Sequence, residues 1–339
     1  MSRREQSEKR EYAGLQKLLR EYYRSLNEFL LPEDLILREF AFQTLSGSFI
    51  RHLSFQNVAE FKDFLIKETP RNSYYSIALY SDPAAQKIED KGYIFAELFF
   101  DIDVDHIPEC STLEYHLIPE ATLTVVSREC VEIGKQEQLK LLDILTYFFG
   151  FSASEVRMYF TGHRGFHTIV RPRDEDWLRL DSRQRRELIN FIKLKNAEKI
   201  TAKSRRSRSL KSTALYARIL KLVETDPTLG FNEALSNAKV EVDELVTPDL
   251  TKLARVINTL NGKTGFRVTA ISSESELVGF SVGPHLSPFK KDLKIRSRYS
   301  SKEEIRIFDY SVRLVKNREF VVPGWVAVYL ALNDVAEII

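Results

Sequence analysis

The sequence predicts a mixed α/β fold. Short runs of alternating apolar and polar residues, typical of strands, are interleaved with segments whose apolar residues recur at helical spacing. Of the 339 residues, 43% are hydrophobic and 11% are aromatic, which is enough to build a buried core and excludes wholesale disorder. A chain of this length would make one large domain or two small ones.

The first half of the chain predicts helices and strands in turn. Pro32 ends the opening helical pattern, and a Ser/Gly turn separates two strand-like runs that predict a hairpin. In chain order, the predicted elements are a helix over 11–31, strands over 37–43 and 48–55, a helix over 56–68, and strands near 73–80 and over 93–106.

The rest of the chain divides by composition. We expect an irregular stretch over 107–128, a long helix over 131–149, and a strand, a tight turn and a strand over 155–171. Between 172 and 238 the sequence is charged, helix-forming and almost free of glycine, which predicts a helical subdomain. The segments 1–171 and 239–339 would then form the core together.

The overall charge limits the functions that the sequence allows. Fifty Lys and Arg against 48 Asp and Glu leave a formal charge of +2, so any nucleic-acid site must be a local patch. The basic run 203–211 is most simply a solvated helix or a mobile loop, although it could also contact phosphates of a nucleic acid.

Compartment can also be argued from the sequence. The two cysteines, Cys110 and Cys130, can form at most one disulfide, and so low a count fits a reducing compartment better than a secreted scaffold. The charged N-terminus has no apolar signal region, and no stretch reaches the about 18 apolar residues of a membrane span. We therefore expect an intracellular protein without a membrane segment.

The strand predicted over 93–106 ends in three acids. Strand alternation puts Asp101, Asp103 and Asp105 on one face and the apolar residues between them on the other. Same-face neighbours lie about 6.5–7 Å apart, a separation that can bracket two divalent ions about 3.5–4 Å apart. An acidic end on a buried central strand favours a metal site, and the alternative is a solvated strand face.

A glycine-rich turn, TGHRGFH over 161–167, separates the next two predicted strands. Gly162 and Gly165 allow a tight turn whose backbone N–H groups favour anions. Arg164 and His167 add side-chain donors of the kind that hold phosphate. The alternative is an ordinary hairpin with a basic tip.

A further acidic segment lies over 240–265. A short strand with Val240 and Val242 would end at Asp243, and the sequence after Thr247 predicts a helix that starts at Asp249. A third carboxylate is what a two-metal site needs beyond an Asp-x-Asp pair. Nothing in the pattern distinguishes Asp243 from the other acids of this segment.

Together these segments resemble the catalytic small subunit of the archaeal and eukaryotic DNA primases, over most of the chain. The matching motifs, in chain order, are REFAF (38–42), RHLSF (51–55), FFDIDVDH (99–106), TGHRGFH (161–167) and VDELVTPDLTKLARVINTLNGKTG (242–265). Thr161 stands where the family usually has serine. The resemblance implies a core of antiparallel-rich sheets flanked by helices.

The resemblance also implies roles for individual residues. Those that would hold two divalent ions, Mg²⁺ or Mn²⁺, are Asp101, Asp103 and Asp243. Those that would bind the incoming nucleotide are Thr161, Gly162, Arg164, His167, Arg255, Asn261 and Lys263. Glu39 and Arg51 match positions at the rim of the active site.

Two departures from the family pattern affect these expectations. Asn261 replaces the usual histidine, so it can donate a hydrogen bond but cannot carry a positive charge, and Lys263 could substitute. The family places a zinc cluster where this chain has Cys110, His116 and Cys130, with Ser127 in the slot of another cysteine. Because structural zinc takes four ligands, the loop 107–130 fits either a zinc site or a metal-free loop.

By resemblance, the chain is expected to be a DNA primase, a DNA-directed RNA polymerase that makes short primers on single-stranded DNA from nucleoside triphosphates. It would work with a large subunit that carries the iron–sulfur cluster, in the cytoplasm if archaeal and in the nucleus if eukaryotic. The alternatives are a stand-alone primase-polymerase that also uses deoxynucleotides, and a noncatalytic nucleic-acid-binding subunit.

Overall fold

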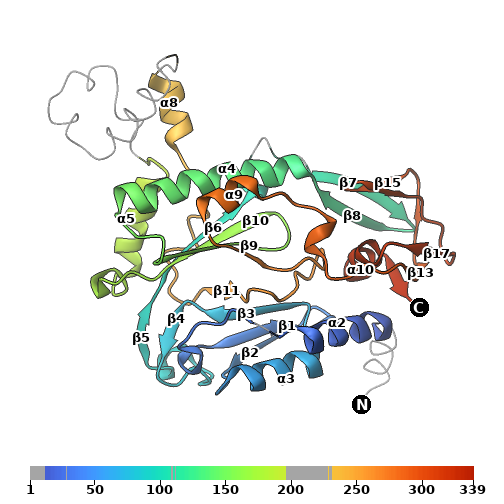
Figure 1. Ribbon diagram of the computed structural model, residues 1–339, viewed down its shortest axis with the longest axis horizontal. Coiled ribbons are helices and arrows are strands. Elements are labelled where there is room, and N and C mark those ends of the chain that lie inside the picture. The colour runs from blue at the N-terminus through green and yellow to red at the C-terminus, as the bar shows by residue number, and fades with distance from the viewer. Residues whose placement is uncertain (1–11, 28, 108–109, 111, 196–227, 229–230) are drawn as a thin grey trace.

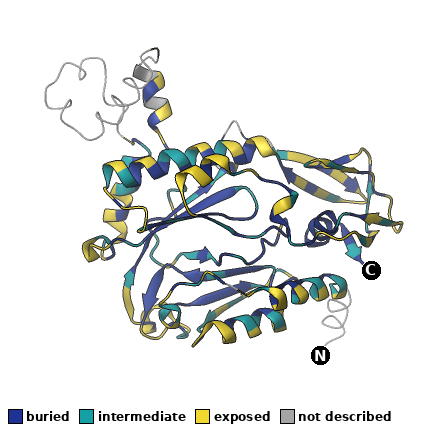
Figure 2. Cartoon of the chain, viewed as in Figure 1, coloured by how far each residue is buried: buried dark blue, intermediate teal, exposed yellow. Residues whose placement is uncertain are grey.

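A computed structural model describes residues 12–27, 29–107, 110, 112–195, 228 and 231–339, and these residues have the predicted mixed α/β fold (Figure 1). Every strand pair in the described part of the chain is antiparallel. Two four-stranded sheets dominate, and each contains strands that are mostly buried (Figure 2).

The first sheet has the strand order β11-β3-β1-β2, and the helices α2 and α3 cover one of its faces (Figure 1). Phe40 and Phe42 point from β1 into this layer, where both rings pack against Phe61 of α3. The elements of this layer are α2 (Ala13–Ser25), β1 (Phe40–Gln43), β2 (Phe49–Leu53), α3 (Val58–Glu68), β3 (Asn72–Ser76) and β11 (Leu253–Arg255).

The second sheet has the strand order β12-β9-β10-β6, with α4 and α9 on its outer face (Figure 1). Gly134 lets α4 approach closely, since a Cβ there would lie 2.7 Å from Val104 Cγ1. The elements of this layer are β6 (Leu98–Asp103), α4 (Arg128–Asp143), β9 (Val156–Phe160), β10 (Gly165–Val170), β12 (Thr269–Ile271) and α9 (Glu274–Gly279).

Smaller elements complete the described fold. They are the pair β4 (Ala78–Tyr80) and β5 (Tyr93–Ala96), the sheet of β7 (Thr112–Ile118), β8 (Ala121–Val126) and β14 (Ser300–Ser301), the sheet of β13 (Leu293–Ser297), β17 (Glu319–Val322) and β18 (Ala336–Ile338), the pair β15 (Ile305–Ile307) and β16 (Tyr310–Val312), and the buried helix α10 (Gly324–Leu332).

The sequence predicts that β6 is a central strand. In the described part of the chain, β6 instead lies at the edge of its sheet. Its outer edge is nevertheless covered, because Asp243 N donates to Asp101 O (2.8 Å) and Thr247 Oγ1 donates to Phe99 O (2.6 Å). This cover explains the continuous apolar sequence that led to the prediction of a central strand.

Three further predictions of local structure were wrong. The stretch 107–128 contains the hairpin β7–β8, whose turn holds Pro119 where it interrupts neither strand. No helix starts at Asp249: its Oδ1 accepts from Thr251 N and Oγ1, a local turn that competes with helix formation, and β11 follows. Val240 and Val242 are buried but belong to no strand.

Other predicted bounds shift by a few residues. The opening helix ends at Ser25 rather than near 31, and α4 begins at Arg128 because Ser127 caps it, accepting a hydrogen bond from Cys130 N. Within 172–238 the structure describes α5 (Ser182–Ile192) and α8 (Phe231–Ala238). The basic run 203–211 lies outside the described residues, and the division into a core and a helical subdomain stays a prediction.

Gly165 tests how closely the strands of the second sheet must approach. A Cβ at this position would lie 2.4 Å from Ile102 O, a backbone atom that cannot move aside. We expect Gly165→Ala to lower the free energy of unfolding by about 1–3 kcal/mol, measured by denaturant titration. Gly279→Ala, in α9, is the control, because a Cβ there meets nothing within 4 Å. Equal stability of the two variants would contradict the prediction.

Candidate active site

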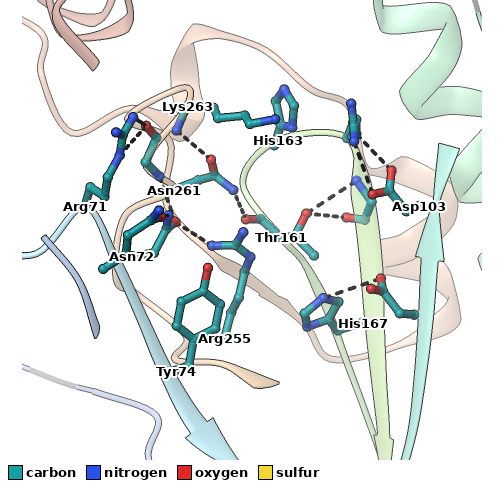
Figure 3. Close-up of a pocket in the computed structure, with 15 residues that line it drawn as sticks. Arg71, Asn72, Tyr74, Asp103, Thr161, His163, His167, Arg255, Asn261 and Lys263 are labelled. Carbon is teal, nitrogen blue, oxygen red and sulfur yellow. Dashed lines mark hydrogen bonds and ion pairs between the residues drawn. The ribbon is translucent and has the colours of Figure 1, made fainter. Parts of the chain in front are cut away.

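A cavity of ≈ 430 Å³ lies between residues of the two large sheets, a size typical of small-molecule sites (Figure 3). It is walled by β3 and β11 of the first sheet, by β6 and β10 of the second, and by two turns over 161–165 and 261–263. The lining residues are Gln43, Arg71, Asn72, Tyr74, Asp101, Asp103, Thr161, His163, Arg164, Gly165, His167, Arg255, Asn261, Gly262 and Lys263.

The end of β6 brings two acids to the cavity. Alternation along the strand buries Phe100 and Ile102 on one face and leaves Asp101 and Asp103 on the other, as the sequence predicts. In the register with β10, Asp103 lies opposite Gly165 and Asp101 lies opposite His167. The aspartate motif and the glycine turn therefore lie on two neighbouring, paired strands of one sheet.

The third acid, Asp243, lies against the outer edge of β6 beside Asp101, although it is not among the residues that line the cavity. Asp243 N bonds to Asp101 O, and the charge of Asp243 acts on the Asp101 carboxyl. The neighbouring acids point to other partners, Glu241 to Lys193 and Glu244 to Lys195. Asp243 is thus the member of its segment that joins the pair, a choice that the sequence pattern left open.

Crowding of carboxylates shifts the ionisation of Asp101. Burial, reinforced by the charges of Asp103 and Asp243, raises the pKa of Asp101 to about 7, and the nearby cations Arg255 and Lys252 offset only part of this shift. The positive charges near Asp101 therefore do not fully compensate its burial and the two neighbouring negative charges.

Arg164 neutralises the neighbouring acids instead. Its guanidinium binds both oxygens of Asp103, from Nε at 2.9 Å and from Nη2 at 3.3 Å, and also pairs with Asp105. Asp243 Oδ1 accepts from Leu245 N at 2.8 Å. With these acids so engaged, the described part of the chain has no set of three His, Cys, Asp or Glu side chains already gathered as a metal site.

The turn over 161–165 has the tight geometry that its glycines predict. Gly162 has a φ of +83°, and Thr161 N and Oγ1 both donate to Gly165 O at 3.0 Å. His163 also lines the cavity, and burial with the neighbouring Arg164 charge holds its pKa well below the usual value. Side chains and backbone of this turn therefore face the cavity together (Figure 3).

A second turn locks onto the first. Asn261 Nδ2 donates to Thr161 O (2.9 Å), and Asn261 Oδ1 accepts from Lys263 N (2.9 Å), while Thr264 Oγ1 donates to Gly162 O. Lys263 projects into the cavity, where burial and the charge of Arg164 lower its pKa. The amide of Asn261 is buried and holds the two turns together, and its contact with a nucleotide stays a prediction.

His167 is held between two partners. Its Nδ1 lies 3.1 Å from Tyr159 Oη, and its Nε2 lies 3.5 Å from Asp101 Oδ1. Burial, with the nearby Arg255 charge, holds the pKa of His167 well below the usual value, so the imidazole is neutral at pH 7. A neutral ring bonded at Nδ1 by the tyrosine hydroxyl can present an N–H from Nε2.

The first sheet supplies lining residues that the sequence analysis missed. Arg255, which was predicted, donates from Nη1 to Asn72 Oδ1 (2.6 Å) and stacks over the Tyr74 ring. Arg71 donates from Nη2 to Gly262 O and Leu332 O, both at 2.6 Å, and so fixes the second turn. The signal available was the alternation of Asn72 and Tyr74 along one strand, although a polar residue on a strand face is common.

Glu39 and Arg51 do not line the cavity. They pair with each other, Arg51 Nε to Glu39 Oε1 at 3.0 Å, and the buried Glu39 also lies 3.5 Å from Lys91 Nζ. The predicted position at an active-site rim is not supported by a contact with the cavity.

The predicted zinc ligands are not assembled. Cys110 and Cys130 are joined by a disulfide, so their sulfurs cannot be thiolate ligands, and His116 is exposed on β7. Ser127, in the slot of a family cysteine, caps α4. The sequence left open whether this loop binds zinc, and the disulfide removes both cysteines as thiolate ligands. Spacing in sequence does not show which side chains meet.

Most residues of this site lie in a segment that matches a known protein family. The family model described as DNA primase small subunit matches residues 100–273, which include both acidic strand positions, both turns and Asp243. A DNA primase small subunit of Hyperthermus butylicus is 33% identical to this chain, over 95% of each. The chain belongs to the DNA primase small subunit family.

Other members of the primase small subunit family are similarly related. The Pyrobaculum calidifontis protein is 34% identical, over 94% of this chain and 97% of its own length, and the Aeropyrum pernix protein is 31% identical, over 94% and 91%. Among solved structures, the polymerase domain of Mycobacterium tuberculosis Ligase D in complex with DNA aligns with a TM-score of 0.41 and 11% identity, over 79% of this chain and 85% of that one. No helix among the described residues of this primase subunit has the length and apolar character of a membrane span.

The raised pKa of Asp101 predicts how stability depends on pH. Between the ordinary value of 3.8 and about 7, the folded protein keeps a proton that the unfolded chain has released, so this group's contribution to stability falls as pH rises through that window. In the presence of a chelator, we expect Asp101→Asn to stabilise the fold by about 1–3 kcal/mol at about pH 8 and by little at about pH 5.

Thermal unfolding at both pH values measures this effect. Asp63→Asn, on the outward side of α3, is the matched control and is expected to change stability equally at the two pH values. A gain for Asp101→Asn that does not depend on pH would contradict the assignment.

The disulfide between Cys110 and Cys130 is expected to affect both stability and thiol reactivity. The bond closes a loop with a sequence separation of 20, for which we expect about 3 kcal/mol of stability to be lost on reduction or in Cys130→Ser. Unfolded, unreduced protein is expected to show no thiol that reacts with Ellman's reagent. Two reactive thiols together with one equivalent of zinc by elemental analysis would restore the zinc site.

Proposed function

We propose that this chain is the catalytic subunit of a primase that joins nucleotides into short RNA primers on a single-stranded DNA template. One observation carries the proposal: Asp101 and Asp103 line the same cavity as the cations Arg164, Arg255 and Lys263, its cationic wall. Carboxylates beside phosphate-binding cations are what nucleotidyl transfer requires.

The acids fit divalent cations. Asp101, Asp103 and Asp243 offer only oxygen donors, which suit Mg²⁺ and Mn²⁺ rather than zinc. Burial and the like charges of Asp103 and Asp243 raise the pKa of Asp101, and bound cations would favour its charged form. When bound, two such ions would supply activation of a 3′-hydroxyl and stabilisation of charge on the α-phosphate.

The chain's own residues then bind and orient the triphosphate. Arg164, Arg255 and Lys263 would supply positive charge, and backbone N–H groups over 162–164, between the bonded N–H groups of Thr161 and Gly165, would supply short-range donors. Neutral His167, oriented by Tyr159, would donate a hydrogen bond from Nε2 without adding a charge. When Asp103 binds a cation, Arg164 would release this carboxylate and bind phosphate instead. The same guanidinium would therefore pair with an acid before substrate binds and with phosphate afterwards.

The partners follow from the family. We propose that a large subunit is a second chain of the enzyme. The name small subunit, which the relatives carry, supports this proposal. An iron–sulfur cluster would lie in that subunit, because this chain has two cysteines and they are paired, whereas such a cluster takes four thiolates.

Primer synthesis tests the proposal. On a single-stranded DNA template with labelled ribonucleoside triphosphates and Mg²⁺ or Mn²⁺, we expect the double variant Asp101→Asn/Asp103→Asn to lose at least about a hundredfold in rate. Asp63→Asn, the same change of side chain on the outward helix α3, is expected to keep full activity.

Unchanged product from the double variant would sink the assignment of the acids. The same assay with deoxynucleoside triphosphates separates this proposal from a stand-alone primase-polymerase, which would extend primers with them equally well. A wild-type chain that binds template but makes no product, with its large subunit present, would favour a noncatalytic binding subunit.

A further inference from the structure

The wall of the cavity formed by the first sheet continues beyond the cavity itself. Gln43 on β1 is the cross-strand partner of both Asn72 on β3 and Phe49 on β2. Cross-strand partners share a face of a sheet, and Asn72 and Tyr74 share one by alternation. Phe49 therefore stands on the same face as three residues that line the cavity, one strand farther out.

Stacked side chains connect this outer position to the cavity. The Arg255 guanidinium lies 5.1 Å from the centroid of the Tyr74 ring, and the Tyr74 and Phe49 rings stack with centroids 6.2 Å apart and planes inclined by 29°. Ala41 is the partner of Tyr74 on the strand between them, and its small side chain leaves room for this contact. Tyr74 lines the cavity, whereas Phe49 lies outside it.

The core does not require Phe49. The opposite face of the sheet, with Phe40 and Phe42, packs under α3, while Phe49 is 57% exposed. A single exposed aromatic side chain is ordinary, but this ring is held in a stack that starts inside the cavity. Its position is fixed while much of its surface stays free.

The charge around this stack suits a polyanion. The cavity holds Arg71, Arg164, Arg255 and Lys263 against Asp101 and Asp103. On β2, Arg51 follows Phe49 by two residues, so it shares the face, and its side chain is 42% exposed while its Nε pairs with the buried Glu39. Proteins bind single strands in this way, with bases stacked on aromatic rings and phosphates on nearby cations.

We propose that Phe49, backed by Tyr74, is a stacking platform for a base of a single-stranded polynucleotide that runs from the cavity across β2. The inference rests on the proposed function, which needs a strand beside the nucleotide cavity, and it names the side chains that hold that strand. A free nucleotide would lie inside the cavity, whereas Phe49 lies one strand beyond its lining.

Strand binding can be measured without catalysis. With the full chain, a labelled single-stranded oligodeoxynucleotide, a chelator and no nucleotide, fluorescence anisotropy is expected to show Phe49→Ala binding about five- to a hundredfold more weakly than wild type. Phe49→Tyr is expected to keep wild-type affinity, and Phe49→Leu to lose it, because only the tyrosine retains a ring. Tyr147→Ala, at a 67% exposed tyrosine in the helical segment after α4, is the matched control and is expected to bind normally.

An abasic strand of the same length separates stacking from contact with phosphates. Wild type and Phe49→Ala are expected to bind it equally, because neither has a base to stack. The proposal is overturned if Phe49→Ala binds the normal strand within about twofold of wild type, if it loses the same factor on the abasic strand, or if it weakens only the binding of free nucleoside triphosphate. Loss of affinity in Phe49→Ala supports the platform even if the wild-type chain makes no primers, so the two proposals fail separately.

Discussion

The close approach of β10 to β6 at Gly165 is the constraint on which the candidate site depends. Because Gly165 has no Cβ, its backbone lies against Ile102 O and fixes the pairing of the two strands. That pairing sets His167 opposite Asp101 and brings Arg164 to Asp103, the last residue of β6. A slip of one residue would turn these side chains to the other face, where α4 packs.

The polar groups of the cavity are oriented mainly by one another. Asn261 ties one turn to the other, Arg164 spans two acids, and Tyr159 holds His167. Such a network keeps donors in place before any ligand arrives, which lowers the ordering cost of binding. Two histidines, His163 and His167, can lie among arginines because burial keeps both of them neutral.

Sequence reasoning worked where the determining contacts are local. The alternation of Asp101 and Asp103, and the turn at Gly162, depend on strand period and on one positive φ, and both were predicted. It failed where a local signal was outweighed by another. The stretch 107–128 was expected to be irregular, although Pro119 lies in the turn of a hairpin, and a helix was expected to start at Asp249, although its side chain closes a turn.

Tertiary contacts account for the rest. Asp243 is distinguished from its acidic neighbours by a backbone bond to Asp101, and Arg71 and Asn72 contribute through residues far away in the sequence. Neither relation leaves a pattern in the sequence. The cysteines show the same limit, because the spacing that suggests a metal loop also allows the disulfide that forms.

The contacts of Arg71 have a consequence for synthesis of the chain. Its guanidinium joins the residue just before β3 to Gly262 and to Leu332, separations of 191 and 261 residues. Because a ribosome releases the N-terminus first, β3 is made long before either partner. The cationic wall is completed only after Leu332 has emerged, so a shorter nascent chain has no finished pocket for phosphates.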